Sequence, residues 1–178
     1  MAKKRRALFV GRFQPLHNGH LEAVRKILEE NDEIIIVVGS AQSSHSLDNP
    51  FTAGERILML RSVLREERID LARCYVIPLP DAEMHAVWAA KVIAYCPPFD
   101  MVYSNEPLTR RLFEEMGFPL GSIPLFRREV YDATEIRRRM LADEEWRSLL
   151  PSCVVSLVDE FDGVGRLKAL SKSDKKGD

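Results

Sequence analysis

The sequence has little that would suit a nucleic-acid-binding protein, a membrane protein or a disulfide-rich protein. Its 26 basic and 27 acidic residues leave a formal net charge of -1, which excludes a broad basic face for nucleic acid. No apolar run reaches the length that crosses a membrane, and no signal peptide is apparent. The three cysteines, Cys74, Cys96 and Cys153, are scattered and form no Cys-x-x-Cys pair. We therefore expect buried free thiols in a cytoplasmic protein.

The length and composition are those of one soluble globular domain. The chain has 178 residues, of which 46% are apolar and 30% charged, enough to bury a sizeable core. We expect one domain over residues 1–178, with a core over about 7–142. A helical extension over about 143–170 and a polar tail over 171–178 would follow it.

Strand-like runs alternate with helix-like stretches along the sequence. The expected strands are 7–10, 33–39, 74–78, 101–104 and, more weakly, 122–126, where Pro124 suits a sheet edge. Between them lie helical patterns, one opened by a capping box at Thr52 and Glu55. This alternation predicts an α/β fold: a Rossmann-like, doubly wound parallel sheet of about five strands with helices on both faces. Ligands of such sheets bind at the carboxyl ends of the strands.

The stretch "GRFQPLHNGH", residues 11–20, is unusually rich in polar donors for a strand-to-helix turn. His17 and His20 are three residues apart at the expected helix start, Gly19 permits close backbone approach, and Arg12 adds a fork of donors. Together they favour an anion site for phosphate. Two alternatives stay open: both histidines could simply cap the helix, or bind a metal, although no carboxylate or thiol lies nearby in the sequence.

The second polar cluster is "YDATEIRRRM", residues 131–140. Asp132 and Glu135 have the spacing of an N-cap and the third helical position, so a helix should begin here. Three successive arginines then point about 100° apart and cannot all face one ligand. Arg137, closest to the loop, is the best candidate for binding a triphosphate, whereas Arg138 and Arg139 suit a solvated face.

These motifs resemble those of a known enzyme family. "GRFQPLHNGH" and "TEIRRRM" resemble the His-x-Gly-His and Thr-x-Ile-Arg motifs of the nucleotidylyltransferase superfamily. "GSAQSSHS", "NPFTAGER" and "EWRSLLP" resemble, more narrowly, the archaeal-type nicotinamide-nucleotide adenylyltransferases. The resemblance runs from about Ala7 to Leu170, and the order and spacing of the motifs are highly specific.

The resemblance implies transfer of the adenylyl group of ATP to nicotinamide mononucleotide, giving NAD and pyrophosphate. The attacking phosphate oxygen is already anionic at pH 7, so the reaction needs positioned donors and cations rather than a general base. Mg²⁺ would be held mainly by the phosphates and by no side chain. The resemblance also implies a homo-oligomer with no nucleic-acid or membrane partner.

The resemblance also assigns residues to the two substrates. His17, His20, Arg12 and Arg137 would be the catalytic set, with His20 at the α-phosphate. The ATP side would further include Gly11, Phe13, Gln14, Gly19, Thr134, Tyr131 and Asp132. The nicotinamide nucleotide would meet Ser40, Pro80, Asp81, Trp88, Ser104, Asn105 and Phe126. Trp88 would stack on the nicotinamide ring, although core packing is the simpler interpretation of a tryptophan in "HAVWAAKV".

Two positions depart from the family pattern. Asp48 stands where relatives often carry a basic residue, and Asp132 stands where serine is usual. Both aspartates bring negative charge toward the polyanionic substrates. Alternatively, the side chain of Asp48 could turn to solvent, and Lys91 or Arg127 could make the phosphate contact that the basic residue of the relatives makes. Two alternatives stay open. One is a sister nucleotidylyltransferase with another small phosphate acceptor, against which Trp88 and the motifs "GSAQSSHS" and "NPFTAGER" argue. The other is a module that binds ATP or NAD without turnover, which only Asp48 and Asp132 favour.

Overall fold

The computed structural model describes residues 4–123 and 131–174 and contains a parallel sheet of five strands in the order β3-β2-β1-β4-β5. Every neighbouring pair is parallel, and Leu8 in the central strand lies opposite Ile35 on one side and Val102 on the other. The strands are β1 (Arg6–Gly11), β2 (Glu33–Val38), β3 (Cys74–Pro78), β4 (Met101–Tyr103) and β5 (Leu120–Gly121).

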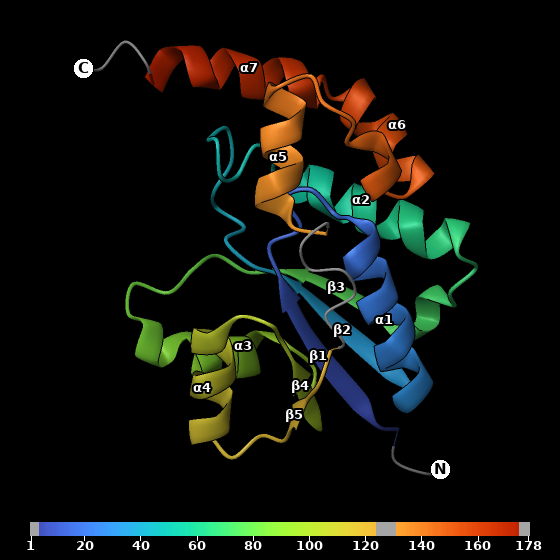
Figure 1. Ribbon diagram of the computed structural model, residues 1–178. Helices are drawn as coiled ribbons and strands as arrows, with labels where there is room; N and C mark the ends of the chain where they lie inside the picture. Colours follow the sequence, from blue (N-terminus) through green and yellow to red (C-terminus); the bar gives the residue numbers. More distant parts are fainter. Residues whose placement is uncertain (1–3, 124–130, 175–178) are drawn as a thin grey trace.

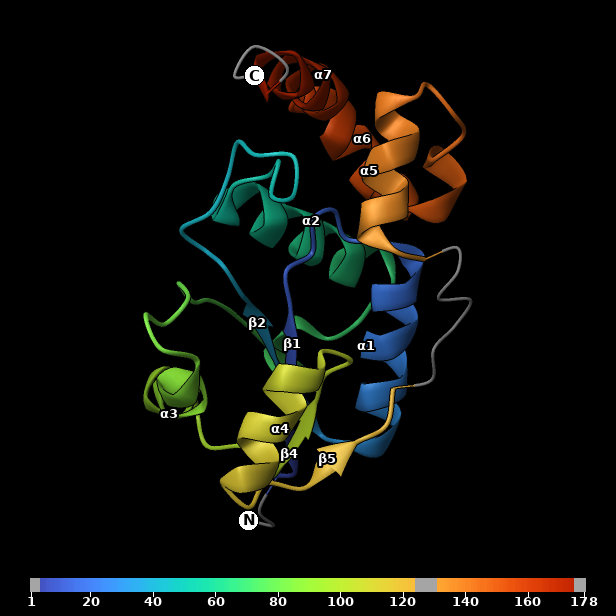
Figure 2. The ribbon, with the colours of Figure 1, turned by 60° about the vertical axis from the view of Figure 1, so that its left-hand side comes forward.

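Helices connect and cover the strands. The α-helices are α1 (Asn18–Glu30), α2 (Ala53–Glu66), α3 (Trp88–Tyr95), α4 (Pro107–Glu115), α5 (Ala133–Leu141), α6 (Ser152–Glu160) and α7 (Gly163–Asp174). Three short 3-10 helices complete the set: η1 (Leu71–Arg73), η2 (His85–Val87) and η3 (Arg147–Leu149). In Figures 1 and 2, α1 and α2 cover one face of the sheet and α3 and α4 cover the other. The fold is therefore the doubly wound α/β sheet that the alternation predicted.

The sheet separates two hydrophobic cores. Successive side chains of a strand point to opposite faces, so Ile34 and Ile36 of β2 join the core under α1 and α2, whereas Ile35 and Val37 join the core under α3 and α4. All four are fully buried. This explains why β2 has an unbroken apolar sequence instead of an alternating one.

The last helices gather beyond the carboxyl ends of the strands, above α1 and α2 in Figure 1. They extend the larger core with buried side chains, namely Trp146, Leu149, Leu150, Val154, Val158 and Leu167. The helical region expected after residue 142 thus packs against the helices of the larger core. It lies beyond the carboxyl ends of the strands, where ligands of such sheets bind.

The helix starts match the predicted caps, but the last strand does not match its predicted position. Thr52 and Glu55 exchange the two hydrogen bonds of a capping box, at 3.2 and 2.8 Å. The edge strand, by contrast, is Leu120–Gly121, not 122–126, and of that predicted stretch residues 124–126 lie outside the described residues. Gly121 sets the position: a Cβ there would lie 2.1 Å from the Tyr103 ring, so only glycine fits beside β4.

The three thiols are half-buried and unpaired. Burial raises the pKa of Cys74 and Cys96 to about 11 and that of Cys153 to about 12. All three are therefore protonated and unreactive at pH 7. Across residues 4–123 and 131–174, no helix combines the length and apolarity needed to cross a membrane.

Candidate functional site

A cavity of about 620 Å³ opens at the carboxyl ends of the strands. Four successive loops line it, which is the arrangement that the fold class predicts for a ligand site. Of the residues expected to bind ligand, the lining includes Gly11, Arg12, Ser40, Asp81, Trp88, Ser104 and Asn105. The Trp88 ring also packs against the core under α3 and α4, so it serves both as a core residue and as a wall of the cavity.

Polar contacts join the loops that follow β2 and β3. The Asp81 carboxylate accepts from the Ser40 hydroxyl at 3.0 Å and from the Gln42 amide at 2.8 Å. Lys91 donates to the carbonyl oxygens of Pro80 and Asp81, at 2.7 and 3.0 Å. The expectation that Lys91 would replace a missing phosphate ligand stays a prediction, and its ammonium group already uses two of its three donors on this loop.

His17 and His20 form a reciprocal cap at the start of α1. The His17 Nδ1 accepts from the backbone N–H of His20 at 3.3 Å, and the His20 Nδ1 accepts from the backbone N–H of His17 at 3.2 Å. Their rings stack with centroids 3.6 Å apart. The capping alternative is thus confirmed in the geometry, but it uses only one nitrogen of each ring.

Both imidazoles are neutral at pH 7. Burial lowers the pKa of His17 to about 4, and burial together with the adjacent His17 ring holds the pKa of His20 well below its ordinary value. A neutral imidazole carries one proton, and each Nδ1 here is an acceptor. The proton of each ring is therefore on Nε2, which gives the start of α1 two side-chain N–H donors.

Gly19 allows the close packing around this histidine pair. A Cβ at Gly19 would lie 2.9 Å from the Cβ of Tyr131 and 3.1 Å from the Nδ1 of His17. The Tyr131 ring lies parallel to that of His17, with centroids 6.4 Å apart. The segments around residues 19 and 131, far apart in the sequence, thus meet only because position 19 lacks a side chain.

The two arginines expected to bind phosphate differ in their surroundings. Arg12 is exposed at the cavity, and none of the described residues accepts a hydrogen bond from its guanidinium. Arg137 is buried and donates to the carbonyl oxygen of Gln14 at 2.9 Å. Its remaining contacts are with Thr134 Oγ1 at 3.4 Å and Asp48 Oδ1 at 3.3 Å.

Asp48 does not turn wholly to solvent. Its side chain is 79% exposed, but it forms an ion pair with Arg137, whose side chain is 5% exposed. Asp132 caps α5 by accepting from the backbone N–H of Glu135 at 3.2 Å, as the spacing predicted. Arg138 and Arg139 pair with glutamates at the surface and do not approach the cavity.

Two other expected site residues, Phe13 and Gln14, have different surroundings. The side chain of Phe13 is buried in the larger core. The side-chain amide of Gln14 exchanges two hydrogen bonds with the backbone of Phe51: it accepts from the N–H at 2.9 Å and donates to the carbonyl at 2.8 Å. Gln14 is therefore not part of the cavity lining. Phe126 lies outside the described residues, as does Arg127.

Two arginines at the site have roles that the sequence reasoning missed. Arg56 of α2 is fully buried and donates only to backbone carbonyls. Burial, with a contribution from the nearby Arg12, lowers its pKa to about 10, so it stays charged at pH 7. One sequence feature could have indicated that Arg56 is buried: it lies on the apolar face of the helix, three and four residues before Met59 and Leu60.

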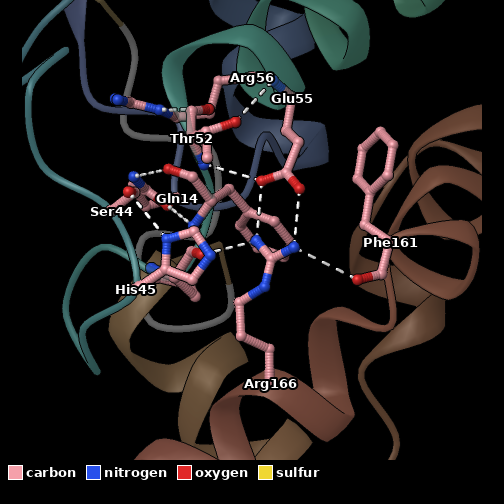
Figure 3. Close-up of polar contacts among 10 residues, drawn as sticks. Gln14, Ser44, His45, Thr52, Glu55, Arg56, Phe161 and Arg166 are labelled. Carbon is pink, nitrogen blue, oxygen red and sulfur yellow. Dashed lines mark hydrogen bonds and ion pairs between the residues drawn. The ribbon is translucent and has the colours of Figure 1, made fainter.

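Arg166 of α7 is the second arginine whose role the sequence reasoning missed. Its guanidinium faces the Glu55 carboxylate (Figure 3), with two bonds of 2.8 Å each, and donates to the Pro50 carbonyl at 2.9 Å. The C-terminal helix is thereby tied to the cap of α2 and to the segment that carries Asp48. No local pattern in the sequence indicates a contact across more than a hundred residues.

Comparisons with known proteins agree with this geometry. The family model of the cytidylyltransferase-like proteins matches residues 8–139. A nicotinamide-nucleotide adenylyltransferase of Methanolobus tindarius is 50% identical over 96% of this chain and 97% of its own length. That of Archaeoglobus fulgidus is 48% identical over 95% of this chain and 99% of its own.

A solved structure with the same fold is the bifunctional NMN adenylyltransferase/ADP ribose pyrophosphatase of Francisella tularensis, complexed with AMP and a Mn ion. It matches with a TM-score of 0.77 at 22% identity, over 96% of this chain and 54% of that one. This likeness shows the fold alone. The family match and the end-to-end identity with the curated relatives establish that the chain belongs to the cytidylyltransferase-like family, among the nicotinamide-nucleotide adenylyltransferases.

Proposed function

We propose that the protein transfers the adenylyl group of ATP to nicotinamide mononucleotide and releases NAD and pyrophosphate. An oxygen of the mononucleotide phosphate attacks the α-phosphorus of ATP, and the bond from that phosphorus to the pyrophosphate oxygen breaks. The nucleophile and the leaving group are both anionic, so no proton has to be transferred. The site must therefore align two polyanions and stabilise the charge that builds up at the α-phosphate.

The observation that carries this proposal is the histidine pair at the start of α1. The mutual cap fixes both rings with Nε2–H available, and the lowered pKa values keep them as neutral donors at physiological pH. We infer that His17 and His20 donate to phosphate oxygens, with His20 at the α-phosphate. Helix N–H groups at the same end add to the attraction for an anion.

The arginines would complete the phosphate site from two sides. The guanidinium of Arg12, from which none of the described residues accepts a hydrogen bond, can bind phosphate directly, in the bidentate manner that arginine favours. Arg137, with Thr134 beside it, would engage the triphosphate once its contact with Asp48 is exchanged for phosphate. Tyr131 and Asp132 would border this region, because they precede α5.

The cavity beside Trp88 would receive the nicotinamide nucleotide. Its indole offers a flat face for the cationic ring, and its lining supplies the polar groups of Ser40, Asp81, Ser104 and Asn105 for ribose and amide contacts. ATP would enter as its Mg²⁺ complex. The phosphates, which carry most of the negative charge, would be the main ligands of the metal ion.

Pyrophosphate release from ATP and nicotinamide mononucleotide in the presence of Mg²⁺ tests the proposal. We expect release with equimolar NAD, and a loss of about 100-fold or more in kcat for His20→Ala, the range of removing one transition-state donor. Because the His20 Nδ1 also caps α1, the melting temperature of each sample should be measured alongside.

A panel of other phosphate acceptors should be run in the same assay. A faster reaction with a phosphopantetheine or a flavin nucleotide would replace the proposed acceptor. A folded protein that binds ATP but releases no pyrophosphate with any acceptor would instead be a nucleotide-sensing module.

A further inference from the structure

Arg56 occupies an unusual position for an arginine. Its side chain is fully buried on the apolar face of α2, where charged residues are rare unless they are paired. Among the described residues it forms no ion pair, although the carboxylates of Asp81 and Glu55 are near enough to favour its charge. Burying a cation that has no ion-pair partner is costly, so the groups that Arg56 holds in place are of interest.

The guanidinium of Arg56 joins three segments through backbone oxygens only. It donates to Arg12 at 2.9 Å, to Gly39 at 2.8 Å and to Ser40 at 3.1 Å, and its Nε donates to Thr52 at 3.2 Å, next to which it lies in Figure 3. The first three acceptors follow β1 and β2, at the mouth of the cavity. Arg56 therefore fixes the two loops nearest to the proposed phosphate site.

The residues that follow two of these carbonyls have strained backbones. Phe13 follows Arg12 and has φ of 54°, and Ser40 follows Gly39 and has φ of 47°. Left-handed backbone is unfavourable for a non-glycine residue, and such strain persists only where the surroundings enforce it. The hydrogen bonds of Arg56 to the preceding carbonyls supply that constraint.

The same constraint orients two N–H groups. A trans peptide unit points its N–H away from its carbonyl, so the N–H groups of Phe13 and Ser40 point away from Arg56. None of the described residues accepts a hydrogen bond from either of them. Backbone N–H groups without a protein acceptor, held in fixed orientation at the carboxyl ends of neighbouring strands, are suited to bind an anion.

We propose that Arg56 is a positioning residue for nucleotide phosphate: it holds the Arg12–Phe13 and Gly39–Ser40 peptide units so that their two N–H groups face the phosphate. Its buried charge adds a favourable potential at the same place. The inference rests on the proposed function, because it takes the bound anion to be the phosphate chain of ATP. Lysine cannot replace Arg56, since a single ammonium group cannot reach acceptors that require a planar fork.

The test compares Arg56→Lys with a matched control, Arg73→Lys. Arg73 also donates only to backbone carbonyls, those of Leu28, Asn31 and Asp32, but at the opposite end of the sheet. Binding of ATP and of adenosine, which has no phosphate, is measured by calorimetry at 25 °C without any acceptor. Melting temperatures are recorded for each protein. Binding without acceptor separates this proposal from the identity of the second substrate.

We expect Arg56→Lys to weaken ATP binding about tenfold, the effect of one charge-assisted hydrogen bond, and adenosine binding less than about twofold. Arg73→Lys should lower the melting temperature without changing either affinity. Equal losses for ATP and adenosine, or none, would show that Arg56 only stabilises the fold and would overturn the proposal.

A measurement on the wild-type protein keeps the proposal testable if the variant fails to fold. Addition of ATP should shift the amide proton resonances of Phe13 and Ser40 downfield, as expected for N–H groups that gain an anionic acceptor. Adenosine should leave both resonances in place. Amide resonances that do not respond to ATP would overturn the proposal, whether or not the protein makes NAD.

Discussion

At the scale of single residues, the site combines neutral histidines with buried arginines. Burial removes the charge of His17 and His20 but leaves Arg56 and Arg137 charged, because a guanidinium keeps its proton even when its pKa falls. The histidines thus act as fixed donors whose charge state does not change near pH 7. In the described part of the proposed phosphate site, the positive charge comes from Arg12, Arg56 and Arg137.

Asp48 should compete with ATP for Arg137. Replacing it by asparagine keeps the shape of the side chain but removes the charge that pairs with Arg137, so we expect the KM for ATP to fall about threefold. Steady-state kinetics at fixed nicotinamide mononucleotide measures this. Asp143→Asn, at an exposed pair with Lys168, is the control and should leave the KM unchanged. A KM that rises in Asp48→Asn would mean that the carboxylate assists binding.

The low pKa of His17 predicts a loss of stability in acid. Between pH 6.5 and about 4 the unfolded chain binds a proton that the folded chain excludes, so the free energy of unfolding falls as the pH falls through this window. The contribution of His17 is about 3 kcal/mol at pH 4 and zero above pH 7. Urea unfolding from pH 4 to 8 should show it.

His17→Asn provides the comparison, because asparagine is also a good N-cap. The variant should lose less stability than the wild-type protein over the same pH range. Parallel curves for the two proteins would contradict the assignment.

At the scale of elements, the start of α2 is fixed from several directions. Thr52 and Glu55 close its capping box, and Arg166 of α7 binds the same glutamate from the other side. The cap therefore depends on a helix more than a hundred residues later in the chain. Because Arg166 also holds the Pro50 carbonyl, it restrains the segment that brings Asp48 to Arg137.

A double-mutant cycle of Arg166→Met and Glu55→Gln measures the interaction energy of the Arg166–Glu55 ion pair. Both side chains are largely buried and the contact is bidentate, so we expect a coupling energy of about 1–2 kcal/mol in urea unfolding. The exposed pair of Arg147 and Asp159 has the same bidentate geometry and should give a clearly smaller coupling energy. Equal coupling energies in the two cycles would show that burial adds nothing.

The sequence predicts an element correctly where neighbouring residues alone determine that element. The unbroken apolar run of β2 and the capping box at Thr52 identify a buried strand and a helix start. The position of β5 depends instead on the Tyr103 ring, which leaves room only for Gly121. Likewise, the contact of Asp48 with Arg137 joins residues 89 positions apart, so the sequence indicates both residues but not their pairing.

At the scale of the whole molecule, the family match and the folded unit differ in extent. The match ends at residue 139, yet the larger core continues through α6 and α7. The curated relatives match along nearly their full length, so these helices are a shared part of the adenylyltransferases. The homo-oligomer implied by the resemblance stays a prediction, which light scattering would test.

A chain that ends at Ala142 should not fold cooperatively. It loses six buried apolar side chains, together worth about 9–18 kcal/mol at about 1.5–3 kcal/mol each, which is of the order of the whole stability of a domain or more. Thermal melting followed by circular dichroism should show no sharp transition. A chain that ends at Asp174 is the control, because it keeps every described helix. A sharp melting transition in the shorter chain would contradict this view.

The sheet that separates the two hydrophobic cores also separates the supports of the two proposed substrate sites. The core under α1 and α2 supports the loops proposed to hold the phosphates, whereas the core under α3 and α4 supports Trp88 and the wall of the cavity. Substitutions confined to the side chains that α3 and α4 place in the cavity wall should therefore change the acceptor with little effect on phosphate binding, which makes the α3–α4 layer the natural place to engineer a new acceptor.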